Sequence, residues 1–139
     1  MFCTKSRKKT LPEAHHEELY KYIWGIIKNR KCFLYRINGV ENHIHIFCDV
    51  HSTICVGDFV KEIKTAANTW IKASGKFPKF DSWAEGYCSI SYNLRDKDMI
   101  INDIKNQKEH HKKVDFEDEL CALLIENGIE FDEKYLFDD

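Results

Sequence analysis

The fold class of this chain is decided by residues 32–50, which read CFLYRINGVENHIHIFCDV. Aromatic and β-branched side chains dominate residues 32–37 and 42–50, and this composition predicts two strands. The dipeptide Asn38-Gly39 lies between the two stretches and is a turn signal. We therefore expect a β-hairpin with a slightly lengthened loop, as part of an antiparallel sheet.

Helices are predicted before and after this hairpin. In residues 12–27 apolar side chains recur every three or four positions, and residues 58–73 repeat that pattern. The remaining predicted elements are a strand at 87–92 and helices at 96–111 and 116–126. Residues 2–4 offer only a fragment of a first strand. This order predicts an α+β fold, with an antiparallel sheet, helices packed on one face and a first strand that is truncated.

The composition favours one domain over residues 1–139. Hydrophobic residues make up 43% and charged residues 32% of the chain, a balance typical of a packed core. No apolar run approaches the roughly 18 residues of a membrane span, and residues 1–9 lack the apolar region of a secretory signal. The six cysteines form no CxxC pair. We expect a cytoplasmic protein with reduced thiols and no contact with a membrane.

Charge is divided unevenly along the sequence. Residues 115–139 form an acidic C-terminal helix and tail, whose ten acidic residues and one lysine give a charge of −9. Because the whole chain has a net charge of −2, the first 114 residues have a charge of +7. A basic body suits a polyanion such as nucleic acid. The alternative is a solubilising tail on an ordinary domain.

A pair of histidines is the first candidate site. Alternate residues of a strand share one face, so His43 and His45 project together while Ile44, Ile46 and Cys48 project into the core. Two imidazoles about 7 Å apart at their Cα atoms can converge on one divalent metal. The alternative is two solvent-facing histidines on a half-exposed strand.

The helix predicted at 96–111 carries the second candidate site. Asp103 and Gln107 are four residues apart and share a face, which His110 or His111 extends. A carboxylate and an amide are suitable oxygen ligands for Mg²⁺ or Mn²⁺. The alternative is a solvated polar face on an amphipathic helix.

Basic residues form the third candidate site. A lysine series begins at Lys61 and is interleaved with Trp70, Phe77, Phe80 and Trp83. Lysines that neutralise phosphates and aromatic rings that stack on bases suit single-stranded nucleic acid. The alternative is a basic helix whose aromatic residues belong to the core, as we expect for Trp70 in either case. The candidate DNA-binding residues are Lys5, Arg7, Lys8, Lys9, Lys61, Lys64 and Lys72.

These motifs together resemble one family. The sequence His43-Ile44-His45 resembles the HUH motif (His, bulky apolar, His) of the single-tyrosine transposases, the insertion-sequence-200-like enzymes and their relatives associated with repetitive extragenic palindromes. Residues 103–111, DIKNQKEHH, are similar to the family's helix motif Tyr-Ile-x-Asn-Gln-x-x-His-His. Three further segments resemble the family in the same order: residues 2–7, 85–87 and 127–136.

The resemblance implies an RRM-like (ferredoxin-like) fold and a homodimer. It also implies that His43, His45 and Gln107 hold a divalent metal, Mg²⁺ or Mn²⁺, which polarises the scissile phosphate of single-stranded DNA. In the family a tyrosine attacks this phosphate and stays linked to it. Asp103 stands at that position here, and its acyl phosphate would be a labile mixed anhydride, unsuited to strand joining.

We therefore expect a transposase that binds single-stranded or hairpin DNA and cleaves and joins strands with the help of a metal, and whose activity is impaired by Asp103. Three alternatives stay open. The chain could be a catalytically silent DNA-binding remnant. It could be a metal-dependent nuclease, in which Asp103 and the metal ligands activate water. It could also be an RRM-like RNA-binding module.

Overall fold

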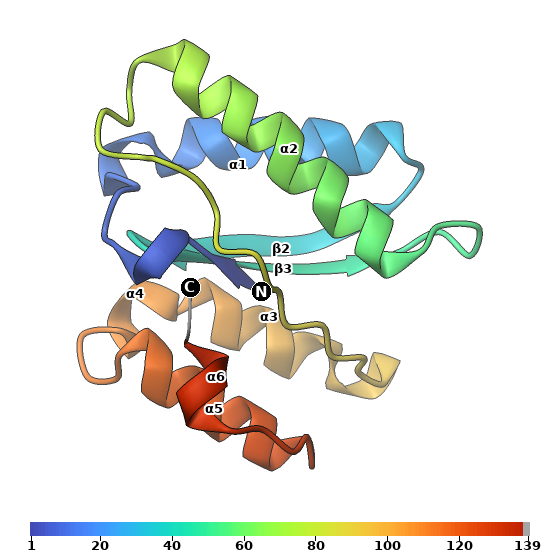
Figure 1. Ribbon diagram of the computed structural model, residues 1–139. Helices are drawn as coiled ribbons and strands as arrows, with labels where there is room; N and C mark the ends of the chain where they lie inside the picture. The colour runs from blue at the N-terminus through green and yellow to red at the C-terminus, as the bar shows by residue number, and fades with distance from the viewer. Residues whose placement is uncertain (138–139) are drawn as a thin grey trace.

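The predicted hairpin forms the centre of the sheet in the computed structural model, which describes residues 1–137 (Figure 1). Strands β2 (Phe33–Val40) and β3 (His43–Asp49) pair antiparallel along their whole length. Val40 pairs with His43, so the connection between the strands is a tight turn. The last two residues of the acidic tail, 138 and 139, lie outside the described residues.

The sequence predicted the turn at Asn38-Gly39, but in the structure the turn occupies residues 41–42. Tertiary contacts override the local signal at both positions. The buried Asn38 side chain donates from Nδ2 to the carbonyl oxygens of Ile104 and Lys105, each at 3.1 Å. Position 39 requires glycine because the backbones of β2 and β3 lie close together there: a Cβ atom would lie 2.2 Å from a backbone oxygen of β3.

Strand β1 (Phe2–Cys3) pairs antiparallel with β3 and gives the sheet the order β1-β3-β2. On its other side the backbone of residues 82–88 bonds to it, with Ala84 N donating to Cys3 O at 2.9 Å and Cys88 N to Met1 O at 2.8 Å. The strand predicted over 87–92 is wrong, since the structure assigns no strand to those residues. Because β1 has only two residues, it offers too few backbone hydrogen-bonding groups to pair with a regular strand over residues 87–92.

One face of the sheet is covered by α1 (His16–Asn29) and α2 (Val56–Ser74), which lie side by side (Figure 1). A turn of 3₁₀ helix, η2 (Glu13–His15), leads into α1, and another, η1 (Lys5–Arg7), follows β1. The two helices bury their apolar stripes against Ile44 and its neighbours on the sheet. The buried apolar side chains of the helices are Leu19, Ile23, Ile27, Phe59, Ile63, Ala67 and Ile71.

The aromatic residues near the lysine series belong to this core. Phe77, Phe80 and Trp83 are buried, and Trp70 stacks on Tyr22 with ring centroids 5.3 Å apart. Stacking of these rings on DNA bases, one of the two alternatives, is therefore excluded for the three buried residues. Gly75 ends α2 with a positive φ of 70°, a conformation that glycine adopts without strain.

The opposite face of the sheet is covered by the C-terminal third of the chain (Figure 1). The helix predicted over 96–111 is divided into η3 (Leu94–Asp96), α3 (Lys97–Lys105) and α4 (Gln107–His110), with a break at Asn106. Helix α5 (Phe116–Glu126) has the predicted bounds, and a short α6 (Glu133–Leu136) follows it.

These contacts confirm an α+β fold with an antiparallel sheet and correct one detail of it. Helices cover both faces instead of one, because β3 alternates apolar and polar side chains and each set finds a cover. Ile100 and Ile104 of α3 are buried on the second face, against β2. Among the described residues 1–137, no helix is both long enough and apolar enough to cross a lipid bilayer.

Candidate metal centre

His43 and His45 project from β3 toward α4 and α5, with ring centroids 5.1 Å apart. The carboxylate of Glu119, on α5, reaches between them: its oxygens lie 3.7 Å from His43 Nε2 and 2.9 Å from His45 Nε2. His111, directly after α4, also contacts this carboxylate through Nε2. One ligand atom from each of these four residues lies within 4.8 Å of all the others.

The cluster is shielded from solvent. The side chain of His43 is fully buried, and those of His45, His111 and Glu119 are 13%, 8% and 11% exposed. The Phe116 ring covers His43 with a centroid distance of 4.7 Å. The two solvent-facing histidines that the sequence left as an alternative are therefore excluded, and a buried polar cluster of this kind needs partners.

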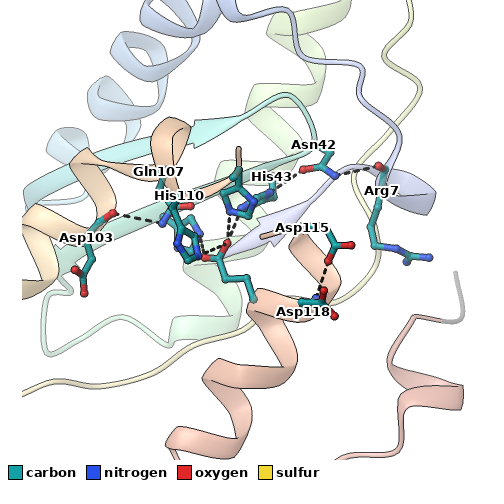
Figure 2. A network of polar contacts seen from close by, with 11 residues as sticks. Arg7, Asn42, His43, Asp103, Gln107, His110, Asp115 and Asp118 are labelled. Carbon is teal, nitrogen blue, oxygen red and sulfur yellow. Dashed lines mark hydrogen bonds and ion pairs between the residues drawn. The ribbon is translucent and has the colours of Figure 1, made fainter. Parts of the chain in front are cut away.

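Hydrogen bonds on the far side of His43 fix its tautomer (Figure 2). The Asn42 side chain donates from Nδ2 to the carbonyl oxygen of Arg7 at 3.2 Å, so its Oδ1 faces the ring of His43. Since Oδ1 only accepts, His43 donates to it from Nδ1 at 2.7 Å. His43 Nε2 therefore carries a lone pair, and that lone pair is on the side of Glu119.

Several atoms of the cluster are close together without forming hydrogen bonds. The Nε2 atoms of His43, His45 and His111 and the Oε2 atom of Glu119 are all buried without a partner of hydrogen-bonding geometry. Buried polar atoms that converge in this way are costly unless a further group satisfies them. A metal ion satisfies all four atoms at once, so the cluster is able to bind one.

The protonation states suit metal binding as well. Burial lowers the pKa of His43 to about 4 and lowers the pKa of His45, and Glu119 opposes both shifts. Burial alone would raise the pKa of Glu119, but its contacts with His111, His43 and His45 outweigh burial and hold that pKa far below its usual range. Neutral imidazoles and an ionised carboxylate are the forms that ligate a metal.

Gln107 and Asp103, predicted from the helix motif, lie beside this cluster. Both line a broad hollow of about 820 Å³ together with His45, Glu119 and Tyr92. Gln107 is buried, donates weakly from Nε2 to the carbonyl oxygen of Asp103 at 3.5 Å, and leaves its Oε1 without a partner. The Asp103 side chain is exposed and points away from the histidines (Figure 2).

Two members of the cluster were missed by the sequence reasoning. His111 was noted as an extension of a helical stripe and as the last residue of the helix motif, but not as a metal ligand, and Glu119 was counted only as part of an acidic segment. Glu119 is eight residues beyond His111 and on another helix, so no local spacing connects the two. The fold alone brings α5 back across the histidines.

The predicted DNA-binding residues of α2 line a groove on the other side of the sheet. Lys61, Lys64 and Lys72 border a space of about 490 Å³ between α2 and residues 82–87. The ammonium group of Lys64 donates to three successive backbone oxygens of residues 84–86, at 2.7 to 3.2 Å. Lys64 therefore holds that segment in place, whereas Lys61 and Lys72 are exposed.

The N-terminal basic residues form a second group, next to α5. Arg7 pairs with Glu117 of α5 at 3.0 Å, and Lys5 lies 3.9 Å from Asp81. Lys8 and Lys9 are exposed. The structure thus divides the predicted DNA-binding residues into two groups, and neither group includes the histidine cluster.

Comparison with known proteins finds a family model and several solved structures that are similar to this chain. A family model described as "Transposase IS200 like" matches residues 1–107. The structure is also similar to that of a candidate transposase from Deinococcus radiodurans R1, with a TM-score of 0.59 and 21% identity over 76% of this chain and 85% of the other. No curated protein matches the sequence. The family match includes His43, His45 and Gln107 and ends before His111 and Glu119.

Proposed function

Because this chain belongs to the IS200-like transposase family, we propose that it binds single-stranded or hairpin DNA and cleaves it with a divalent metal, without a covalent tyrosine intermediate. The observation that carries this proposal is that His43, His45 and Gln107 each have a buried ligand atom without a partner, and that His45 and Gln107 line the same hollow. The similarity to a transposase structure supports the fold on which this arrangement rests.

The residues present fit the metal that the family uses. His43 and His45 direct buried Nε2 atoms toward the same space, and Gln107 has a buried Oε1 atom without a partner. A divalent ion held there, Mg²⁺ or Mn²⁺, would polarise the scissile phosphate. Such a phosphate needs access to the ion, so the Glu119 carboxylate has to leave His43 and His45 before DNA is cut.

Asp103 changes the chemistry at the position of the nucleophile. Asp103 supplies no phenol for covalent capture of DNA, and its exposed carboxylate points away from the histidines, so cleavage by water is the reaction that these residues favour. Tyr92 also lines the hollow and is a second candidate nucleophile. Burial raises the pKa of Tyr92, however, which makes its phenol a weaker nucleophile near neutral pH.

We infer DNA binding, a homodimer and a cytoplasmic location as parts of the same proposal. Lys61, Lys72 and the N-terminal basic residues supply exposed positive charge for phosphates. Within the described residues β2 has no strand on its outer side, and this open edge is where a second copy would add to the sheet. Sedimentation that finds only a 16.5 kDa species at micromolar concentration would contradict the dimer.

A labelled hairpin DNA incubated with the protein and Mn²⁺, and analysed on a denaturing gel, tests the cleavage step. We expect free cleaved ends and no slow protein–DNA adduct, and we expect His43→Ala and His45→Ala to abolish cleavage. Asp103→Tyr restores a phenol four residues before Gln107, so it should give a trace of Mn²⁺-dependent adduct. A strong wild-type adduct that persists in Asp103→Ala and disappears in Tyr92→Phe would overturn the assignment of Asp103.

DNA binding is tested separately by its dependence on salt. Lys61→Ala and Lys72→Ala should each reduce the slope of log affinity against log salt by about 1, because each removes one phosphate contact. Lys21→Ala is the matched control, since Lys21 is exposed on α1 and pairs with Glu17 at 3.2 Å. Affinity independent of salt would contradict the proposal, and stronger competition by single-stranded RNA would indicate the RNA-binding alternative.

A second candidate function, a catalytically silent DNA-binding protein, is favoured by one observation. Glu119 covers both histidines of the HUH motif, and His43 is fully buried beneath it. In that case the hairpin DNA is bound and stays intact, even when Glu119 is replaced by Ala. Cleavage by the Glu119→Ala variant would exclude the silent protein.

A further inference from the structure

His43, His45 and His111 surround the Glu119 carboxylate, and these four residues differ from the ligand set that the family resemblance implies. We propose that His43, His45, His111 and Glu119 are the four ligands of a transition metal of the Zn²⁺ class, and that this metal ties helix α5 to strand β3. This site shares His43 and His45 with the proposed cleavage site, but its metal binding is measured without DNA. His111 and Glu119 lie outside the segment that matches the family.

The first argument is geometric. In a tetrahedral zinc site with ligand distances near 2.1 Å, neighbouring ligand atoms are roughly 3.4 Å apart. The Glu119 carboxylate oxygens lie 2.9 Å from His45 Nε2 and 3.7 Å from His43 Nε2, on either side of that value. All four ligand atoms lie within 4.8 Å of one another, so small side-chain movements bring them to one ion.

The second argument is the chemistry of the donor atoms. Mg²⁺ prefers six oxygen ligands in octahedral geometry and keeps several waters, whereas imidazole suits Zn²⁺, Co²⁺ and Ni²⁺. Three imidazoles and one carboxylate therefore select against Mg²⁺.

The third argument is the support behind the ligands. Metal-bound histidines donate their other ring N–H to a protein oxygen, which fixes the tautomer and the orientation of the ring. His43 does so through Asn42 Oδ1 at 2.7 Å, and Asn42 is itself fixed by the Arg7 carbonyl oxygen (Figure 2). This chain of contacts leaves Nε2 as the free ligand atom of His43.

The number of ligands indicates what the metal does. Catalytic zinc sites combine three protein ligands with one open position, and structural sites are closed by a fourth protein ligand. Glu119 supplies that fourth ligand from α5. Helix α5 buries only Phe116, Leu120 and Leu124, so a metal would add considerably to its attachment. The filled site also denies a DNA phosphate access to His43 and His45.

Metal binding alone, without DNA, tests the inference. Protein freed of metal with a chelator should bind one Zn²⁺ per chain and gain thermal stability, while millimolar Mg²⁺ gives no such gain. His111→Ala and Glu119→Ala should each weaken Zn²⁺ binding at least 10-fold. His51→Ala is the matched control, because His51 is exposed, bonds to Thr53 and lies outside the four-residue set. Equal stabilisation by Mg²⁺, or no effect of His111→Ala, would overturn the proposal.

Co²⁺ in place of Zn²⁺ shows whether the site is closed. The wild-type protein should give the intense visible spectrum of tetrahedral Co²⁺, unchanged by added azide because no position is open. Glu119→Ala should keep three histidines and gain a position that azide occupies, with a visible spectral shift. A wild-type spectrum that responds to azide would overturn the closed site. Circular dichroism of each variant verifies that it is folded, and DNA affinity of the same samples reports on the proposed function independently.

Discussion

The two faces of the sheet are held in different ways. On the α1 and α2 side, Ile44 packs into a continuous apolar core. On the α4 and α5 side the next residue along β3, His45, meets a carboxylate and two further histidines, and the apolar cluster of α5 has only three buried members. The comparison shows that one strand can supply both a stable scaffold and a polar centre, because its side chains alternate between the faces.

The apolar face should be the more sensitive to truncation. Ile63→Ala removes a fully buried side chain of α2, and we expect it to lower the free energy of unfolding by about 2 to 5 kcal/mol. Urea denaturation measures the change. Ile125→Ala on α5 is the control, because that side chain is 69% exposed and should change stability by less than about 0.5 kcal/mol. Equal effects of the two variants would break the contrast between the faces.

The polar face should be the one that acid weakens. Burial holds the pKa of His43 near 4, below the unfolded value of about 6.5, so on acidification the unfolded chain takes up a proton first. For metal-free protein we expect a loss of about 2 kcal/mol from this group between pH 7 and pH 5. The lowered pKa of Glu119 adds a further loss below about pH 4.5.

The measurement for this prediction is urea denaturation at several pH values in the presence of a chelator. His43→Gln should lose less stability than the wild type as the pH falls from 7 to 5. Some dependence stays in the variant, because burial also lowers the pKa of His16 on α1 and of His45. Identical pH profiles for the two proteins would contradict the assignment to His43.

The lysines of α2 should separate into one that stabilises the fold and others that do not. Lys64→Met removes three hydrogen bonds to the backbone of residues 84–86, and we expect a loss of about 1.5 kcal/mol. Lys72→Met changes an exposed side chain on the same groove and should alter stability by less than about 0.5 kcal/mol. Thermal denaturation compares them, and an unchanged Lys64→Met protein would show that the segment 82–88 is held by β1 alone.

The smallest effect is expected at the start of α5. The Asp115 carboxylate accepts from Asp118 N at 2.9 Å, so Asp115→Ala should cost about 1 kcal/mol. Hydrogen exchange of α5 amides is the readout, and amides of α1 should be unaffected. Asp132→Ala, which removes the corresponding bond at the four-residue α6, is the control and should leave α5 unchanged. Faster exchange throughout the sheet would mean that the two faces unfold together.

The sequence correctly predicted those elements whose conformation depends mainly on the local pattern of apolar and polar residues. The amphipathic stripes of α1 and α2 and the alternation in β3 depend on local periodicity, and they were confirmed. The strand at 87–92 and the turn at Asn38-Gly39 were wrong, because in both places tertiary partners decide the backbone conformation. The similarity of the histidine pair and the Gln107 helix to one family was confirmed by the match over residues 1–107.

By itself the sequence determined which side chains could act: two histidines on one strand face, an aspartate at the position of the nucleophile, and basic residues apart from an acidic C-terminal segment. The tertiary structure decided which of them meet. It placed Glu119 against His43, His45 and His111, and it pointed Asp103 away from them. The physical reason is that periodicity fixes the face on which a side chain lies, whereas contacts between distant elements follow from how α5 packs across the sheet.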